Sequence, residues 1–171
     1  MHQDHSIKDQ IKTVEYDHVI YSLNEDEMTA NVFETPYGMI EVYIPRSIHY
    51  ESKEYIVARI LKDSLSHSFI ESIQFAPDSE IEIIEKESFS GMKIESITIP
   101  SKVKRLCEKV FYKCYNLKTV DFQNDSKLEI IEKKAFSYSG IERFTIPSKV
   151  KEMKEGWCSY TENLKEIRVD R

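Results

Sequence analysis

The chain has 171 residues, of which 40% are hydrophobic and 32% charged, a composition that allows one domain with a sizeable core and argues against disorder over the whole length. Its formal net charge of -6 argues against a protein devoted to nucleic acid or anionic membranes, because both need clustered lysine and arginine to displace counterions. Three cysteines without a CxxC pair fit neither a disulfide framework nor a zinc signature.

The N-terminus, residues 1–14, is expected to be a disordered tail. It begins MHQDHSIKDQ, which lacks the apolar segment behind a basic start that marks a secretory signal. Further along, no apolar run approaches the roughly 18 residues that a membrane-spanning helix needs. As written, the chain therefore reads as a cytoplasmic protein without membrane insertion.

Residues 15–38 are expected to form a β-hairpin. Two β-rich runs, HVIYSL and TANVFE, flank the short acidic connection NEDEM, which is a hairpin pattern. A hairpin at this place would cover the open edge and the apolar end of the coil that follows it. We therefore predict an N-terminal cap.

Residues 39–69 follow the pattern of later segments loosely. MIEVYIPRSI aligns with the later IESITIPSKV, which places Pro45 with Pro100 and Ile48 with Val103. After the insertion HYESKEY, the run VARILKDSLSHSFI aligns with the later LEIIEKKAFSYSGI. We predict that this segment is a first, divergent coil of a repeat.

The repeat becomes plain after residue 69. IESITIPSKVK at residues 94–104 returns as IERFTIPSKVK at residues 141–151, 47 residues later, and that interval divides into coils of 24 and 23 residues. Each coil opens with apolar residues at its first, fourth and sixth positions, with polar residues between them. The fourth and sixth positions alternate as a β-strand requires, so each coil is expected to begin with a short strand.

A second apolar segment and a large anchor residue complete each coil. The anchor is Phe89, Phe111 or Phe136 in three successive coils. Cys158 takes its place in the next coil, where the neighbouring Trp157 could supply the missing bulk. One coil cannot bury these faces alone, whereas stacked coils turn equivalent positions into continuous internal columns. Each buried Ile, Leu or Phe would then contribute roughly 1.5–3 kcal/mol.

The motif resembles the BspA-like, Treponema pallidum-type leucine-rich repeat family, whose coils run LxxIxIPxxVxxIxxxAFxxCxx. IPSKVKRLCEKVFYKCYNL and SKLEIIEKKAFSYSGI carry the likeness, over about three consecutive coils and part of a fourth. The resemblance implies a β-rich, right-handed leucine-rich-repeat solenoid over residues 39–171, with short parallel strands, short helical turns and the β-hairpin cap. The family's usual glycine after the second segment is replaced by Cys107, Glu132 and Lys154, which leaves the turn geometry there open.

The C-terminus carries no recognisable cap motif. The chain stops at Arg171, just after an expected strand. Either residues 164–171 form a terminal edge strand protected by their charges, or the solenoid continues in a longer protein.

No set of residues indicates catalysis. Cys114, the most conspicuous candidate for a reactive thiol, aligns with mostly small residues in neighbouring coils and is expected to be a buried structural residue. The five histidines lack the paired spacing that metal sites favour, and no phosphate-binding, zinc-protease or serine-hydrolase motif occurs. We therefore expect no enzyme activity, no cofactor and no metal site.

Function is expected on the outward positions of the opening strands, the face on which solenoids usually bind partners. The resemblance to BspA-like proteins implies an adhesion and surface-antigen module at the cell surface, whose partner would be an extracellular-matrix or host-surface protein. An intracellular scaffold without an adhesive role is the alternative, and plain solubility of this face also stays open. The candidate partner-binding residues, at the second, third and fifth positions of three coils, are Glu95, Ser96, Thr98, Lys118, Thr119, Asp121, Glu142, Arg143 and Thr145.

Overall fold

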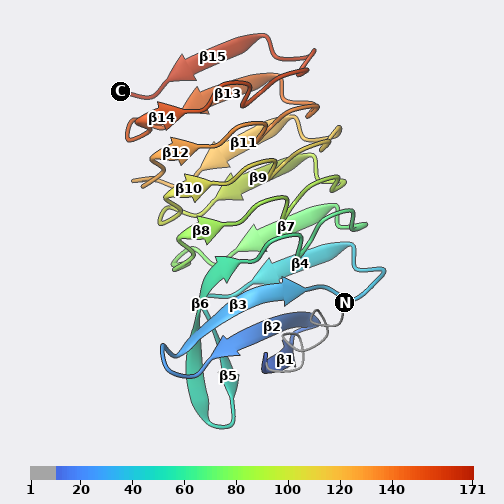
Figure 1. The fold of residues 1–171 in the computed structure, drawn as a ribbon, viewed down its shortest axis with the longest axis vertical. Coiled ribbons are helices and arrows are strands. Elements are labelled where there is room, and N and C mark those ends of the chain that lie inside the picture. Colours follow the sequence, from blue (N-terminus) through green and yellow to red (C-terminus); the bar gives the residue numbers. More distant parts are fainter. Residues whose placement is uncertain (1–10) are drawn as a thin grey trace, which may run out of the picture.

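The computed structural model describes residues 11–171, and this range consists of β-strands and turns wound into stacked coils (Figure 1). The predicted solenoid with short parallel strands is confirmed, whereas the expected short helical turns are absent from the described range. Residues 1–10 of the expected tail lie outside it. Thr13 and Val14, which were also assigned to the tail, belong to a strand.

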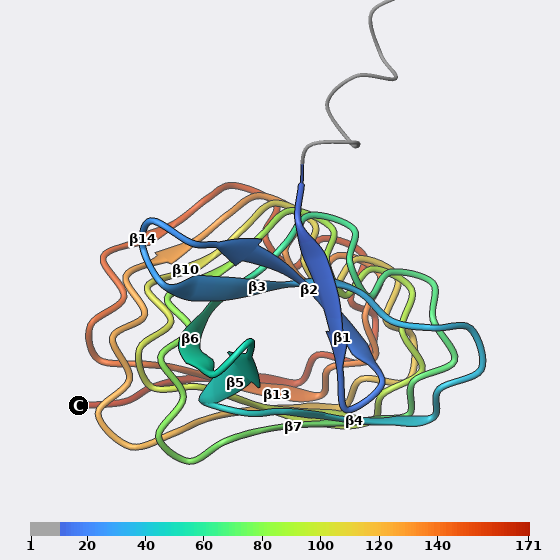
Figure 2. The ribbon, with the colours of Figure 1, turned by 90° about the horizontal axis from the view of Figure 1, so that it is seen from below.

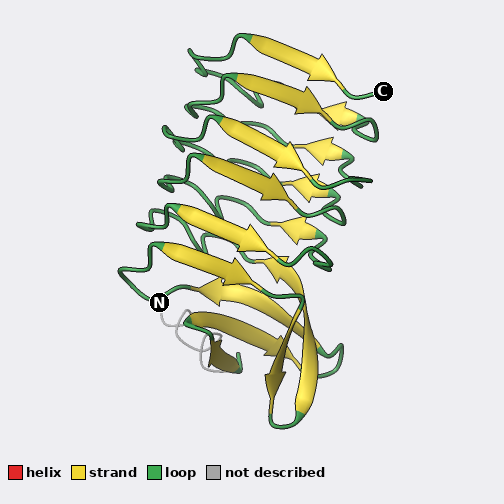
Figure 3. Cartoon of the chain, turned by 180° about the vertical axis from the view of Figure 1, so that it is seen from behind, coloured by secondary structure: helices red, strands yellow, loops and turns green. Residues whose placement is uncertain are grey.

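Each coil opens with a four-residue strand, and these strands lie parallel along one side of the solenoid (Figure 3). In β9, Ile97 and Ile99 are buried, while Ser96 and Thr98 between them are exposed. The alternation in the sequence is therefore the inward and outward alternation of a strand. The opening strands are β4 (Glu41–Ile44), β7 (Ser72–Phe75), β9 (Ser96–Ile99), β11 (Thr119–Phe122), β13 (Arg143–Ile146) and β15 (Glu166–Val169).

The opening strands pair in twos, β4 with β7, β9 with β11 and β13 with β15. Within each pair, the residue after the second strand donates its N–H to the last residue of the first strand, as Gln123 N does to Ile99 O at 3.0 Å. At the steps between pairs, Pro100 and Pro147 occupy the donor position, and proline has no N–H. We call these two places the proline steps.

A second parallel ladder runs along another side of the solenoid. Its short strands pair continuously with one another and with the end of β6 (Lys53–Ile60). No proline interrupts this ladder, so each step keeps its hydrogen-bond donor, as at Lys104 N to Glu82 O, 2.9 Å. The strands are β8 (Ile83–Ile84), β10 (Arg105–Leu106), β12 (Ile130–Ile131) and β14 (Glu152–Met153).

The N-terminal segment is an antiparallel sheet that extends this second ladder. β2 (Val19–Asn24) and β3 (Thr29–Glu34) form a hairpin within residues 15–38, and β1 (Thr13–Tyr16) pairs with β2. β3 then pairs in parallel with β6, and the three strands lie across the end of the solenoid (Figure 2). Tyr21, Ala30 and Val32 are fully buried in the same core as the coils.

The insertion of the divergent coil is a second hairpin. β5 (Ser47–Tyr50) pairs antiparallel with the first half of β6, and the two project beyond the stack of coils (Figure 1). Glu51 and Ser52 connect them with φ of 49° and 63°, the left-handed pair that tight hairpin turns favour. The end of β6 then pairs with β8, as the alignment of the divergent coil requires.

The anchor residues form an internal aromatic column. Phe89 stacks on Phe111 with ring centroids 5.3 Å apart, and Phe111 stacks on Phe136 at 5.2 Å. Trp157 meets Phe136 edge-on at 5.9 Å. The indole therefore supplies the bulk that Cys158 lacks at the anchor position.

Turns connect each second segment to the next coil where helical turns were expected. Alternate N–H groups donate to the carbonyl three residues earlier, as Val110 does to Cys107, and the N–H groups between them donate to the next coil, as Phe111 does to Ala135. However, Lys109 has a φ of 56°, and the equivalent Lys134 and Gly156 have 57° and 72°. A left-handed residue interrupts the run of right-handed dihedral angles that a helix needs, so the turn does not continue as a helix.

The residues that replace the family's usual glycine adopt an unstrained backbone. Cys107, Glu132 and Lys154 do not have positive φ, and the left-handed residue lies two positions later. The position of the turn thus explains why a residue with a side chain is tolerated where the family has glycine.

Candidate partner-binding surface

The nine candidate residues lie on one surface, which we call the strand face: the outward side chains of the opening strands and of the residue before each strand. Eight of the nine are exposed and Glu142 is half-buried. Within the β9–β11 pair, Ser96 lies beside Thr119 and Thr98 beside Asp121. The face therefore brings residues of successive coils into adjacent rows.

Charged residues at the second position of the coils form ion pairs along this face. Lys118 Nζ lies 3.9 Å from Glu95 Oε2, and Lys165 Nζ lies 3.8 Å from Glu142 Oε2. Exposed pairs of this kind contribute little to stability, because water screens both charges. Their charged groups can therefore change partners at little cost when another protein binds.

Two hollows open on the strand face, one at each proline step. The first hollow, 470 Å³, lies between β7 and β9, and the second hollow, 440 Å³, lies between β11 and β13. Glu95, Ser96 and Thr98 line the first hollow, and Asp121 and Thr145 line the second. The steps where proline removes a backbone donor are thus the places where the strand face is hollowed.

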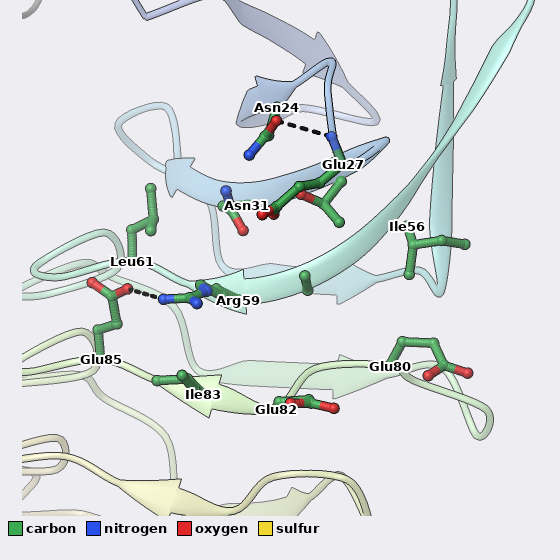
Figure 4. Close-up of a pocket in the computed structure, with 12 residues that line it drawn as sticks. Asn24, Glu27, Asn31, Ile56, Arg59, Leu61, Glu80, Glu82, Ile83 and Glu85 are labelled. Carbon is green, nitrogen blue, oxygen red and sulfur yellow. Dashed lines mark hydrogen bonds and ion pairs between the residues drawn. The ribbon is translucent and has the colours of Figure 1, made fainter.

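A further hollow of 540 Å³, which the sequence did not predict, lies on the second ladder where β3 and β6 meet β8 (Figure 4). Arg59 Nη1 lies 3.7 Å from Glu85 Oε1, and the other oxygen of Glu85 accepts the Lys62 N–H at 3.1 Å. Asn24 Oδ1 accepts the Glu27 N–H at 3.1 Å on the opposite wall. This hollow exists because the N-terminal hairpin packs beside β6, a pairing that no local sequence pattern predicts.

Several exposed aromatic side chains lie on or near the strand face, although the sequence pattern did not place them among the candidate binding residues. Tyr43 lies on the strand face beside Gln74 and is 47% exposed. Just before β4 and β7, Tyr37 and Phe69 pack edge to face at 5.5 Å and remain 92% and 51% exposed. Aromatic residues of this kind often dominate the energy of protein interfaces. Tyr43 could have been found, because it holds the fifth position of the divergent coil.

The cysteines are placed for packing. Cys114 is fully buried and its Sγ donates to Phe89 O at 3.0 Å. Burial raises the pKa of Cys114 to about 12 and that of Cys107 to about 11, which keeps both thiols protonated near neutrality. Over residues 11–171, the structure shows no group of three or more His, Cys, Asp or Glu side chains that could hold a metal ion.

The stacked coils, the parallel opening strands and the internal columns define a leucine-rich-repeat solenoid. The family model described as the BspA type leucine rich repeat region matches residues 58–171 with six copies, and the chain belongs to that family. Among curated proteins, the sequence has no significant match.

Solved structures share the fold. The pneumococcal vaccine antigen PcpA matches 94% of this chain with a TM-score of 0.74 and 21% identity, and a leucine-rich repeat protein from Bacteroides ovatus matches 91% with a TM-score of 0.79 and 22% identity. This chain spans 50% and 40% of the lengths of those two chains. A leucine-rich repeat protein from Bacteroides capillosus is matched over 93% of this chain and 99% of its own, with a TM-score of 0.58 and 20% identity.

Residues 11–171 contain no helix that is long and apolar enough to cross a bilayer.

Proposed function

We propose that this chain is a non-enzymatic protein-interaction and adhesion module that binds its partner through the strand face. The observation that carries the proposal is the strand face itself, where exposed polar residues of paired strands are held in register and hollows open at the two proline steps between the pairs. Rigid elements hold binding groups more precisely than loops, so such a face suits recognition of another protein surface.

The proposed partner is an extracellular-matrix or host-surface protein. Membership of the BspA type family and the fold shared with a pneumococcal vaccine antigen support this choice of partner class. The proposed contact residues are the nine candidates on β9, β11 and β13 and before them, with Tyr43 added at the N-terminal end of the same face.

The test is a binding panel of purified extracellular-matrix proteins against the immobilised full chain. Thr98→Arg and Thr119→Arg each place a long charged side chain on the strand face and should weaken binding by about tenfold or more. Thr13→Arg is the matched control, because Thr13 is exposed on β1, away from the face. A panel without any binder, or a binder equally affected by all three substitutions, contradicts the proposal.

A further inference from the structure

The corner that follows the strand face carries a row of charged residues, which we call the corner column. Glu80, Lys102, Lys127 and Lys149 each lie three residues before the first residue of β8, β10, β12 or β14. Because those four strands pair in register, the four side chains occupy equivalent places on successive coils.

The first half of the corner column is neutralised by ion pairs. Lys102 Nζ lies 2.5 Å from Glu80 Oε2, and Arg46 Nη2 lies 3.7 Å from Glu80 Oε1. One acidic residue therefore stands between two basic ones, an arrangement that favours the stacking of these coils.

A neighbouring column shows the same alternation along its whole length. Glu82, Lys104, Glu129 and Lys151 alternate in sign, with Lys104 Nζ 2.8 Å from Glu82 and Lys151 Nζ 3.2 Å from Glu129. The sign of the charge thus alternates from coil to coil in this column, and a column without such alternation is an exception on this surface.

The second half of the corner column departs from the alternation. Lys127 lies 47 residues after Glu80, where the longer repeat would place an acidic residue, and it is followed by another basic residue, Lys149. Over residues 11–171, no carboxylate oxygen lies within 4.0 Å of either ammonium group. The neighbouring Lys127 side chain and its positive charge lower the pKa of Lys149, against a smaller opposite effect of Asp125.

The register of β12 and β14 places Lys127 and Lys149 at equivalent positions of adjacent coils, so their positive charges repel each other in the free protein. An anion placed between them removes that repulsion and adds charge-assisted hydrogen bonds. Lys149 also lines the second hollow, together with Thr145, Ser148 and Asn124. These hydroxyl and amide groups can form hydrogen bonds with the main-chain N–H and C=O groups of a peptide. The corner therefore combines an anion site with a polar hollow beside it.

The surroundings favour a short acidic segment over a long polyanion. Asp121, Asp125 and Asp170 line the same second hollow, and Glu71 and Glu95 line the first. A nucleic acid or sulfated polysaccharide that followed the strand face would meet these carboxylates, whereas a single Glu or Asp side chain of a partner would not.

We propose that Lys127 and Lys149 anchor an acidic segment of the protein partner, with one carboxylate between the two ammonium groups and the adjoining main chain in the second hollow. The proposal rests on the proposed function and adds the chemistry of the partner to it.

The experiment measures binding of a fluorescein-labelled glycine-serine peptide that carries a single glutamate to the full chain by fluorescence anisotropy at low and high salt. Lys127→Glu restores the alternating column and should weaken binding by about tenfold, and Lys127→Gln should weaken it by several-fold. Lys93→Glu is the matched control, since Lys93 is exposed at the other end of the opening strands and carries the same change in charge. It should change the affinity by less than about twofold.

Thermal melting separates loss of the site from loss of the fold. Lys127→Glu should raise the midpoint of unfolding, because an acidic side chain then stands between Lys102 and Lys149. Equal weakening by Lys93→Glu and Lys127→Glu overturns the proposal. So does equal binding of the same peptide with lysine in place of the glutamate, or tighter binding of a sulfated oligosaccharide or an oligonucleotide than of the glutamate peptide.

The two proposals can fail separately. Consider a matrix protein from the panel whose binding is abolished by Thr98→Arg but changes less than about twofold with Lys127→Glu. That result overturns the acidic-segment proposal and leaves the strand-face proposal standing. A matrix protein affected by Lys127→Glu but by no strand-face substitution overturns the strand-face proposal and leaves the acidic-segment site standing.

Discussion

Phe111 and Phe136 lie one coil apart with ring centroids 5.2 Å apart and ring planes 13° from parallel, and both side chains are fully buried. Phe89 stands on one side of the pair and Trp157 on the other. The column thus links four coils through direct ring contacts, and each of the two central rings supports a neighbour on either side.

Phe136→Ala should lower the free energy of unfolding by about 3–5 kcal/mol, because the truncation leaves a cavity between Phe111 and Trp157 that the rigid ladder cannot close. Urea unfolding followed by circular dichroism measures the change. Tyr115→Ala is the control, since Tyr115 is 64% exposed and should matter by less than about 1 kcal/mol. A neutral Phe136→Ala would contradict the stacked column.

Lys134→Gly should stabilise the protein by about 0.5–1 kcal/mol, because glycine adopts the left-handed backbone at this position without steric strain. Gly156→Ala should do the opposite, by about 1–2 kcal/mol, since Gly156 has a φ of 72° and a Cβ there would meet Ser159 Oγ at 3.0 Å. Lys133→Gly, at a residue without positive φ, controls for the flexibility of glycine in the unfolded chain. Thermal melting of the three variants tests the turn geometry.

Pro100→Ala should create a slowly exchanging amide at position 100, because the new N–H faces the end of β7 as Gln123 N faces Ile99 O. Native-state hydrogen exchange measures its protection, and the Gln123 amide is the reference within the same protein. A fast-exchanging amide at position 100 would show that proline is not what separates β7 from β9.

Cys107 should react with a thiol reagent at about pH 8 roughly 100-fold more slowly in the native protein than in the unfolded chain, because burial raises its pKa from 9.0 to about 11. Cys114, whose pKa burial raises to about 12, should react more slowly still. Since both shifts favour the neutral thiol, the stability that they contribute is present at neutral pH and is lost as the pH rises above about 9. Rapid labelling of Cys114 in native protein would contradict its structural assignment.

Tyr21→Phe should raise the free energy of unfolding by about 1 kcal/mol, because the buried Tyr21 hydroxyl has no hydrogen-bond partner among the described residues. Tyr21→Ala should instead lower it by about 3–5 kcal/mol, since the ring packs in the same core as the coils. Urea unfolding compares the two variants. A small effect of Tyr21→Ala would mean that the N-terminal hairpin does not act as a cap.

Several features were predictable because they depend on residues close together in the chain. Ile97 and Ile99 alternate with Ser96 and Thr98, and that alternation alone is enough to predict a strand with one buried face. The recurrence of Phe89, Phe111 and Phe136 likewise predicts an internal column. The helical turns were wrongly expected because the family pattern was followed, whereas Lys109 adopts a left-handed backbone that its side chain does not announce.

The order of residues along the chain was enough to define the coils, their inward residues and the position of the strand face, because periodic burial depends on near neighbours. Which strand edges meet became known only from the folded stack: β3 lies beside β6, the opening strands lie in pairs, and Lys127 lies one coil from Lys149. The reason is that hydrogen bonds and charge contacts across coils join residues more than twenty positions apart, and their outcome depends on how the whole stack closes.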